Sequence, residues 1–212
     1  MNELTTFILL AVILLNFFLL GSSRLGACIR VVAAQGSLLS LLPVLVDSMS
    51  GHSYVLMAGA LTIKGGVIPW LLFRAIRQVG IRREIEPRIG YIMTMMLGGL
   101  TTAGAFIFAD RLPLLAAHQQ SLFIPAAFST LGAGFLMLIT RRKAITQVLG
   151  YLIFENGIFI FGILLAEAMP LFVETGVLLD MLVAIFVMGI VMNHINREFS
   201  SIDTEHLCLL KE

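Results

Sequence analysis

Three ionisable side chains interrupt long apolar stretches of this sequence: Lys64, Glu155 and Asp180. On insertion scales, one charged group at the centre of a bilayer costs roughly 2.5–3.5 kcal/mol. Three such groups together oppose insertion by about 8–10 kcal/mol, whereas small residues and hydroxyl groups hold membrane helices together at lower cost. Because intramembrane carboxylates commonly relay protons, the three residues predict a proton-relay or coupling site. The alternative interpretation is that they pair only to hold helices together.

Gln35, Asn156 and Tyr151 are candidate accessory polar residues. Asn156 directly follows Glu155, and Tyr151 precedes Glu155 by one helical turn. Gln35 and Glu155 lie 11 and 12 residues beyond basic residues, a distance of ~17 Å at ~1.5 Å per residue. Since the hydrocarbon layer is ~30 Å thick, both residues are expected near its midplane. Similar arithmetic places the other two ionisable residues at about the same depth.

The segment around Lys64, "IKGGVIPW", carries Gly65, Gly66 and Pro69. Proline cannot donate the backbone hydrogen bond that the Gly65 carbonyl expects in an α-helix. The helix is therefore expected to kink or loosen beside Lys64, where freed carbonyls or water could meet an ammonium group. The plainer interpretation is an ordinary proline kink.

The composition predicts an all-α integral membrane protein. Of the 212 residues, 58% are hydrophobic and 13% are charged, against about 25% charged in soluble domains, and the mean hydropathy is +0.98. Apolar runs of about 18 or more residues are typical of transmembrane helices. Seven such runs occur, at about 4–21, 27–46, 54–76, 90–109, 121–140, 144–166 and 172–193. Because they use most of the chain, no soluble catalytic domain is expected, and the chain is not predicted to be an enzyme on its own.

The basic residues predict that the N-terminus lies outside and the C-terminus in the cytoplasm. With this orientation only Arg111 falls outside, and Lys64 remains within the membrane. Twelve basic residues fall on the inner side: Arg24, Arg30, Arg74, Arg77, Arg82, Arg83, Arg88, Arg141, Arg142, Lys143, Arg197 and Lys211. Such an asymmetry follows the positive-inside rule. The first apolar run has neither a positive leading segment nor a small-residue cleavage site, so we expect it to be a retained span.

The polar segment "IRREIEPRIG", at 81–90, divides the chain into comparable parts. We expect an N-terminal three-helix half at 1–88, a connector helix with an outer loop at 89–119, and a C-terminal three-helix half with a cytoplasmic tail at 120–212. In each half a basic cluster is followed 11 to 13 positions later by a polar residue, Gln35 or Glu155, and then by glycine. A degenerate internal repeat is one interpretation of this weak similarity.

No cofactor or metal is expected in this chain. Its two cysteines, Cys28 and Cys208, form no CxxC pair and lie toward the predicted cytoplasmic face, where disulfides are rare. The four histidines are scattered near the ends of spans, at positions 52, 118, 194 and 206. Neither a P-loop nor a GxGxxG motif occurs, so nucleotide binding has no support.

Four segments resemble the hydrogenase-4 component E family, the membrane subunits of group 4 nickel–iron hydrogenase and formate hydrogenlyase complexes. These segments are "GALTIKGGVIPWLL", "ITQVLGYLIFENGIFIFG", "VETGVLLDMLVAIFVMGIVM" and "IDTEHLCLLK". The C-terminal half, about 120–205, is also similar to the K-type membrane subunit of complex I and to its counterpart in Mrp-type sodium/proton antiporters. That subunit has two midplane glutamates, which fall on Glu155 and Asp180. Aspartate at the second position departs from the pattern and shortens the side chain by one methylene.

The resemblance implies a non-catalytic membrane-arm subunit of a redox-driven complex in the cytoplasmic (inner) membrane. Its implied partners are antiporter-like membrane subunits, a complex-I-type membrane anchor, and peripheral hydrogenase and iron–sulfur subunits; no nucleic acid is implied. Glu155 would then be one station on a hydrophilic axis shared between subunits. A stand-alone secondary ion transporter and a structural scaffold whose buried charges set helix register are the alternatives.

Cysteine labelling tests the predicted topology. Single cysteines at Ser50 and Ser200, in a chain otherwise stripped of cysteine, should react with a membrane-impermeant maleimide from opposite sides of the membrane. The first should react from outside and the second from the cytoplasm. Equal reaction of both positions from one side contradicts the topology.

Overall fold

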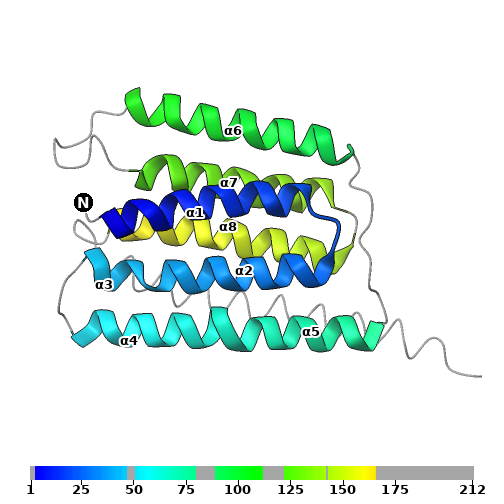
Figure 1. The fold of residues 1–212 in the computed structure, drawn as a ribbon, viewed down its shortest axis with the longest axis horizontal. Coiled ribbons are helices and arrows are strands. Elements are labelled where there is room, and N and C mark those ends of the chain that lie inside the picture. Colours follow the sequence, from blue (N-terminus) through cyan, green and yellow to red (C-terminus); the bar gives the residue numbers. More distant parts are fainter. Residues whose placement is uncertain (1–2, 47–50, 80–88, 112–121, 142, 166–212) are drawn as a thin grey trace, which may run out of the picture.

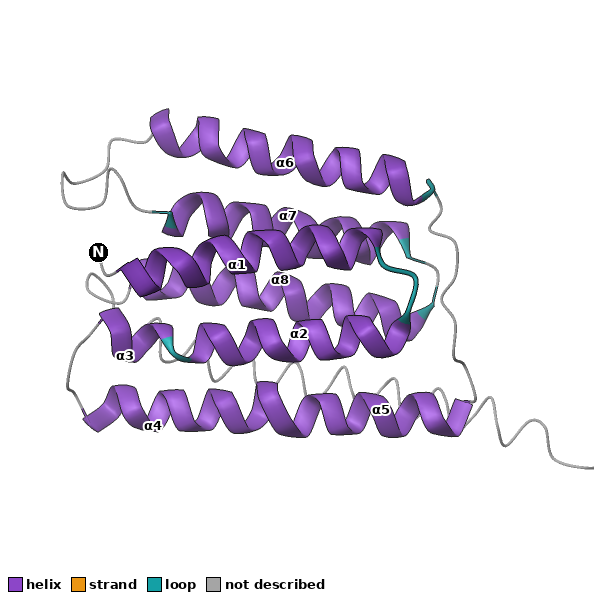
Figure 2. Cartoon of the chain, in the orientation of Figure 1, coloured by secondary structure: helices purple, strands orange, loops and turns teal. Residues whose placement is uncertain are grey.

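The structure, a computed structural model, describes residues 3–46, 51–79, 89–111, 122–141 and 143–165. In this part of the chain every regular element is a helix (Figures 1 and 2). The all-helical class predicted from the sequence is therefore confirmed over these residues. In chain order the elements are α1 (Glu3–Gly21), α2 (Leu25–Ser40), α3 (Leu42–Val46), α4 (Gly51–Ala60), the π-helix η1 (Leu61–Val67), α5 (Ile68–Val79), α6 (Tyr91–Arg111), α7 (Phe123–Thr140) and α8 (Ala144–Leu165).

Five helical segments of the described chain are long and apolar enough to cross a membrane. They are Glu3–Gly21, Leu25–Val46, Tyr91–Arg111, Phe123–Thr140 and Ile145–Leu164. The run predicted at 54–76 is helical throughout, but its middle is π-helical, so it is divided among α4, η1 and α5. The run predicted at 172–193 lies outside the described residues. The count of seven spans and the orientation of the termini therefore remain predictions.

The helices run back and forth beside one another, with α6 at one edge of the bundle and the α4–η1–α5 rod at the other (Figure 1). Between these edges lie α1, α2, α7 and α8. The C-terminal ends of α1 and α7 and the N-terminal ends of α2 and α8 lie at the same end of the bundle (Figure 1). Arg24, Arg141 and Lys143 lie next to these helix ends, whereas Arg111 ends α6 at the opposite end. This distribution agrees with the basic asymmetry on which the predicted orientation rests.

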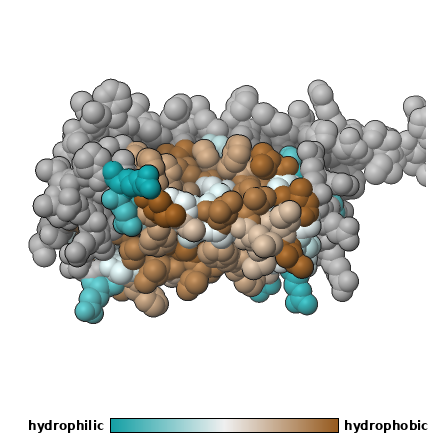
Figure 3. Space-filling model, turned by 90° about the horizontal axis from the view of Figure 1, so that it is seen from above, coloured by the Kyte–Doolittle hydropathy of each residue, from teal (hydrophilic) through white to brown (hydrophobic). Residues whose placement is uncertain are grey.

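The surface between the two ends is apolar. On the face drawn in Figure 3, hydrophobic residues cover most of the coloured surface, and hydrophilic residues gather toward its two ends. Large side chains such as Leu14, Ile92 and Leu100 are more than two-thirds exposed. Extended exposed apolar surfaces are unusual on soluble monomers. They are the expected outer surface of a helix bundle surrounded by lipid.

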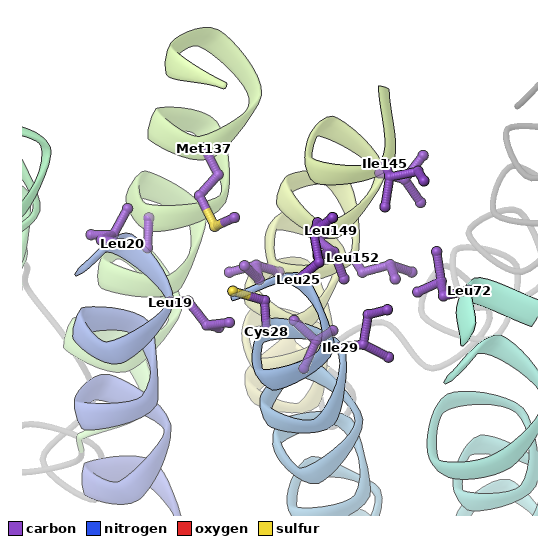
Figure 4. Close-up of a cluster of buried hydrophobic side chains, with 14 of the residues drawn as sticks. Leu19, Leu20, Leu25, Cys28, Ile29, Leu72, Met137, Ile145, Leu149 and Leu152 are labelled. Atoms are coloured by element: carbon purple, nitrogen blue, oxygen red, sulfur yellow. The ribbon is translucent and has the colours of Figure 1, made fainter. Parts of the chain in front are cut away.

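Among the described residues the interior contains two hydrophobic clusters, one toward each end of the bundle. Figure 4 shows the first, where Leu19 and Leu20 of α1 and Met137 of α7 meet side chains of α2, α5 and α8. The second joins α1, α2, α3, α7 and α8 around Leu9, Leu39 and Ile160. Lipid tails are as apolar as leucine, so these clusters hold the helices together by close van der Waals packing and not by escape from water.

The closest helix pair, α7 with α8, depends on glycine. A Cβ atom added to Gly134 of α7 would lie 2.6 Å from Cα of Phe154. One added to Gly157 of α8 would lie 2.7 Å from the backbone nitrogen of Leu131. Because both obstacles are backbone atoms, a side chain could fit only if the two helices moved apart.

Arg141, at the turn between α7 and α8, is buried and caps α1. Its Nη2 donates hydrogen bonds to the carbonyl oxygens of Leu20, at 2.9 Å, and Leu19, at 3.4 Å. These carbonyls belong to the last turn of α1, which has no α-helical partner for them. The guanidinium carbon also lies 4.9 Å from the ring centroid of Tyr91. From the sequence Arg141 was interpreted only as part of a cytoplasmic basic cluster; in the fold it connects three helices.

Substituting Gly134 tests the close packing of α7 on α8. Gly134→Ala should lower the free energy of unfolding by about 1–3 kcal/mol, since overpacking a tight interface forces the backbones apart. Gly104→Ala on α6 is the matched control, because a Cβ there has no atom within 4 Å, and it should leave stability unchanged or slightly raised. Thermal unfolding of both variants in lipid nanodiscs gives the comparison, and equal stability of the two would contradict the interpretation.

Candidate functional site

The π-helix η1 carries Lys64 and confirms that the helix loosens where the sequence predicts it. The N–H of Ile68, which follows η1, bonds to the carbonyl of Ile63, five residues back, as in a π-helix. Pro69 has no N–H for the Gly65 carbonyl, so the α-helical pattern cannot continue through this point. Single π-helical turns occur often at functional sites, and here the widened turn holds the ammonium-bearing residue.

Lys64 forms an ion pair with Glu155 of α8. Its Nζ lies 2.8 Å from Oε1 of Glu155, and the two side chains are 16% and 5% exposed. The distance is typical of a charge-assisted hydrogen bond. The same Nζ donates to Oδ1 of Asn156 at 3.1 Å and lies 5.0 Å from the ring centroid of Phe159. Lys64 is thus paired with a carboxylate of this chain.

Two glycines allow η1 to approach α2 closely enough to shelter this pair. A Cβ on Gly36 would lie 2.9 Å from Cβ of Lys64, and one on Gly65 would lie 2.7 Å from Oγ of Ser37. A side chain at either position would push Lys64 away from the bundle. The glycine that follows Gln35 therefore has a local purpose, independent of any internal repeat.

A small cavity of about 10 Å³ adjoins the ion pair. Its wall includes Gly36, Lys64, Glu155 and Asn156, together with apolar side chains of α2, α5 and α8. That volume is about the least that can admit one water molecule. Oε2 of Glu155 is buried and accepts no hydrogen bond from the described residues. One oxygen of this carboxylate is thus held by the ammonium, while the other is available to a proton or a proton donor.

Gln35 is fully buried but makes its hydrogen bond elsewhere. Its Nε2 donates to Oδ1 of Asn16 at 2.9 Å, and Nδ2 of Asn16 donates to Oγ1 of Thr130 at 2.9 Å. Thr130 in turn donates to the carbonyl of Ala126 at 2.7 Å. This amide chain, Gln35–Asn16–Thr130, joins α2, α1 and α7. Lys64 contacts Gly36 of α2, and the neighbouring residue Gln35 belongs to the amide chain. The two polar groups of contacts are therefore held by adjacent residues of α2.

Asn16, Thr130 and Phe159 take part in these polar contacts but are not among the residues predicted from the sequence. Asn16 had a usable signal, because it is a lone amide in the apolar run "ILLNFFLL". Thr130 lies in "FSTLGAG", which indicates only small-residue packing. Phe159 is one of 15 phenylalanines, and nothing in its neighbours along the chain predicts contact with a lysine.

The remaining candidates have different outcomes. Asn156 is buried and contacts Lys64 directly, and Tyr151 is half-buried one turn before Glu155 on α8. Asp180 lies outside the described residues, so its proximity to Glu155 remains a prediction. Within the described ranges, no group of three or more histidine, cysteine, aspartate or glutamate side chains could hold a metal ion.

The ion pair can take up a proton without losing all of its contacts. A proton that binds Oε2 of Glu155 neutralises the carboxylate and weakens its hold on the ammonium. Lys64 would still have Oδ1 of Asn156 and the ring of Phe159, since a cation over an aromatic face is attracted by the ring. Asn156 and Phe159 thus offer the ammonium contacts that do not depend on the charge of Glu155.

A double-mutant cycle tests the amide chain. Asn16→Leu should destabilise the chain, because it leaves the buried Nε2 of Gln35 without its acceptor. Asn16→Leu combined with Gln35→Leu should cost less than the sum of the single changes, with a coupling of about 1 kcal/mol, typical of hydrogen bonds between membrane helices. Thermal unfolding in nanodiscs measures each term, and strictly additive effects would contradict the bond between these residues.

The chain is similar in sequence to several known proteins. It is 29% identical, over 191 residues, to the uncharacterised protein Rv0085 of Mycobacterium tuberculosis, covering 89% of this chain and 87% of that protein. It is 27% identical, over 156 residues, to hydrogenase-4 component E of Escherichia coli K12, covering 73% of this chain and 71% of that protein. Hydrogenase-4 component E of Shigella flexneri matches to the same extent.

No family model matches the chain, and no solved structure matches it significantly. The distant homology over most of the chain supports the resemblance to hydrogenase-4 component E that the sequence segments indicated. The similarity of the C-terminal half to the K-type subunit of complex I remains a prediction.

Proposed function

We propose that this chain is a non-catalytic membrane subunit of a hydrogenase-related, redox-driven complex, and that its buried ion pair contributes to proton translocation or coupling. Two facts support the first part of the proposal: a bundle of apolar helices, and homology to hydrogenase-4 component E over 73% of the chain. The observation that carries the second part is the ion pair between Lys64 and Glu155.

The ion pair is a costly way to join two helices. Removing two charges from water is expensive, and a buried pair is often no more stabilising than apolar residues of similar volume. The bundle already has apolar clusters and close glycine contacts to hold its helices. A lysine and a glutamate far from the span ends therefore favour a function that needs charge in the membrane.

In the proposed mechanism Glu155 is the proton-binding group and Lys64 is its counter-charge. A proton enters at Oε2, the buried oxygen that has no partner among the described residues, by way of water in the adjoining cavity. Protonation loosens the ion pair, and Lys64 is retained by Asn156. Departure of the proton restores the pair. Asp180 is proposed as the next carboxylate to receive the proton.

The proposed partners are those that the resemblance to the hydrogenase-4 component E family implies. They are antiporter-like membrane subunits, a complex-I-type membrane anchor, and peripheral hydrogenase and iron–sulfur subunits, in the cytoplasmic membrane. The partners would supply the redox reaction, and the rest of the proton path would continue through neighbouring membrane subunits.

Glu155→Gln tests the proposed relay. The amide cannot carry the proton, so proton uptake by proteoliposomes containing the whole co-purified complex should fall at least tenfold. Assembly and peripheral redox activity should persist, because the amide is nearly isosteric with the carboxylate. Glu3→Gln, the same chemical change on an exposed side chain at the end of α1, is the matched control and should translocate normally.

Further variants separate the relay from its alternatives. Lys64→Met should impair coupling or assembly, while Lys64→Arg should be partly tolerated because it keeps the charge. Asp180→Asn should reduce translocation more mildly than Glu155→Gln, and Asp180→Glu should be tolerated. If Glu155→Gln assembles and translocates protons at the wild-type ratio, Glu155 is structural. If the isolated chain moves ions in liposomes by itself, it is a stand-alone transporter.

A further inference from the structure

We infer that Glu155, Asn156 and Phe159 form a monovalent-cation site whose occupant is the ammonium group of Lys64, so that the tethered cation excludes sodium from this place in the membrane. The inference goes beyond the proposed place in a complex, because it depends only on contacts within this chain. It assigns Lys64 a role in determining which cation the site accepts.

The ligands converge on one point from a single helix. Oε1 of Glu155 and Oδ1 of Asn156 lie 2.8 and 3.1 Å from Nζ, and the Phe159 ring centroid lies 5.0 Å from it. Residues three and four apart share one face of a helix, so Phe159 lies beside both oxygens. A carboxylate oxygen, an amide oxygen and an aromatic face are ligands that a small monovalent cation can use.

The cation comes from a different element than its ligands. Lys64 extends from η1, whereas all three ligands belong to α8. Removal of the lysine side chain would therefore leave the oxygens in place. The vacated volume lies against Gly36, which has no side chain to fill it, and next to the cavity of about 10 Å³. An ion with a water ligand could occupy that combined space.

With Lys64 in place, sodium meets two obstacles. The ammonium already neutralises the carboxylate, and a second cation on the same oxygens would be repelled at contact distance with little water to screen it. A proton differs from sodium because it binds covalently to Oε2 of Glu155 and needs no coordination shell. The intact site thus admits a proton while it refuses a metal cation.

Cation-dependent stability of the full-length chain in nanodiscs tests this inference. Wild-type protein should melt at the same temperature in sodium chloride and in choline chloride of equal ionic strength. Lys64→Ala should melt about 3–6 °C higher in sodium than in choline, because an ion that binds only the folded state stabilises it. Lys64→Ala combined with Glu155→Gln should lose the response, and Lys64→Met, whose side chain fills the vacated space, should show none.

The other possible results of this experiment either contradict or support the inference. A sodium response in wild type equal to that of Lys64→Ala, or one that persists without the Glu155 carboxylate, overturns it. So does a folded Lys64→Ala that ignores sodium, or one that fails to fold in either salt. Folding of Lys64→Ala only in sodium supports it. The readout is stability and not translocation, so it is separate from the test of the proposed function.

Discussion

An ammonium and a carboxylate that leave water together must satisfy each other, and the arrangement around Lys64 and Glu155 follows from that constraint. Lys64 comes from η1 and Glu155 from α8, and the pair lies beside Gly36 of α2. Both helices therefore pack close to α2 at this point. Gly36 and Gly65 allow the approach, and the π-helical turn presents the lysine where Pro69 prevents a regular α-helix. Removing one partner of a buried pair costs about 3–5 kcal/mol, because the other charge is left uncompensated. The pair therefore connects η1 with α8 beside α2.

The cost of burying a polar group without a hydrogen bond also favours the other polar contacts of the bundle. The amide chain joins α1, α2 and α7 through bonds of 2.9 Å. Arg141 uses its guanidinium on the terminal carbonyls of α1. A bond of 2.8 Å between Thr102 and Ser129 connects α6 with α7. These contacts connect helices across the bundle and not along any one helix. Polar contacts thus connect neighbouring helices, while the apolar clusters and glycine contacts supply the close packing.

The ion pair differs from these neutral contacts in what it can do. A neutral hydrogen bond holds helices in register and has one chemical state. A carboxylate with one oxygen on an ammonium and the other without a partner in the described chain has two, with and without a proton. The surrounding side chains give the ammonium contacts in both states. These two states are what the proposed role in coupling requires of the site.

The sequence by itself determined the features that depend only on the residues themselves and their neighbours along the chain. Hydropathy, which depends on each residue, predicted the helical membrane class and most of the described helices; the missing N–H of Pro69 predicted the loosened helix; and counting residues from the basic clusters placed Lys64 and Glu155 at similar depth. The sequence does not determine which helix lies next to Lys64, because several helices carry polar residues at a similar depth. Only the tertiary structure decided that Lys64 meets Glu155 and Asn156, that Gln35 turns to Asn16, and that Arg141 caps α1. Those partners lie far apart along the chain, and what brings them together is the packing of whole helices, which no local pattern encodes.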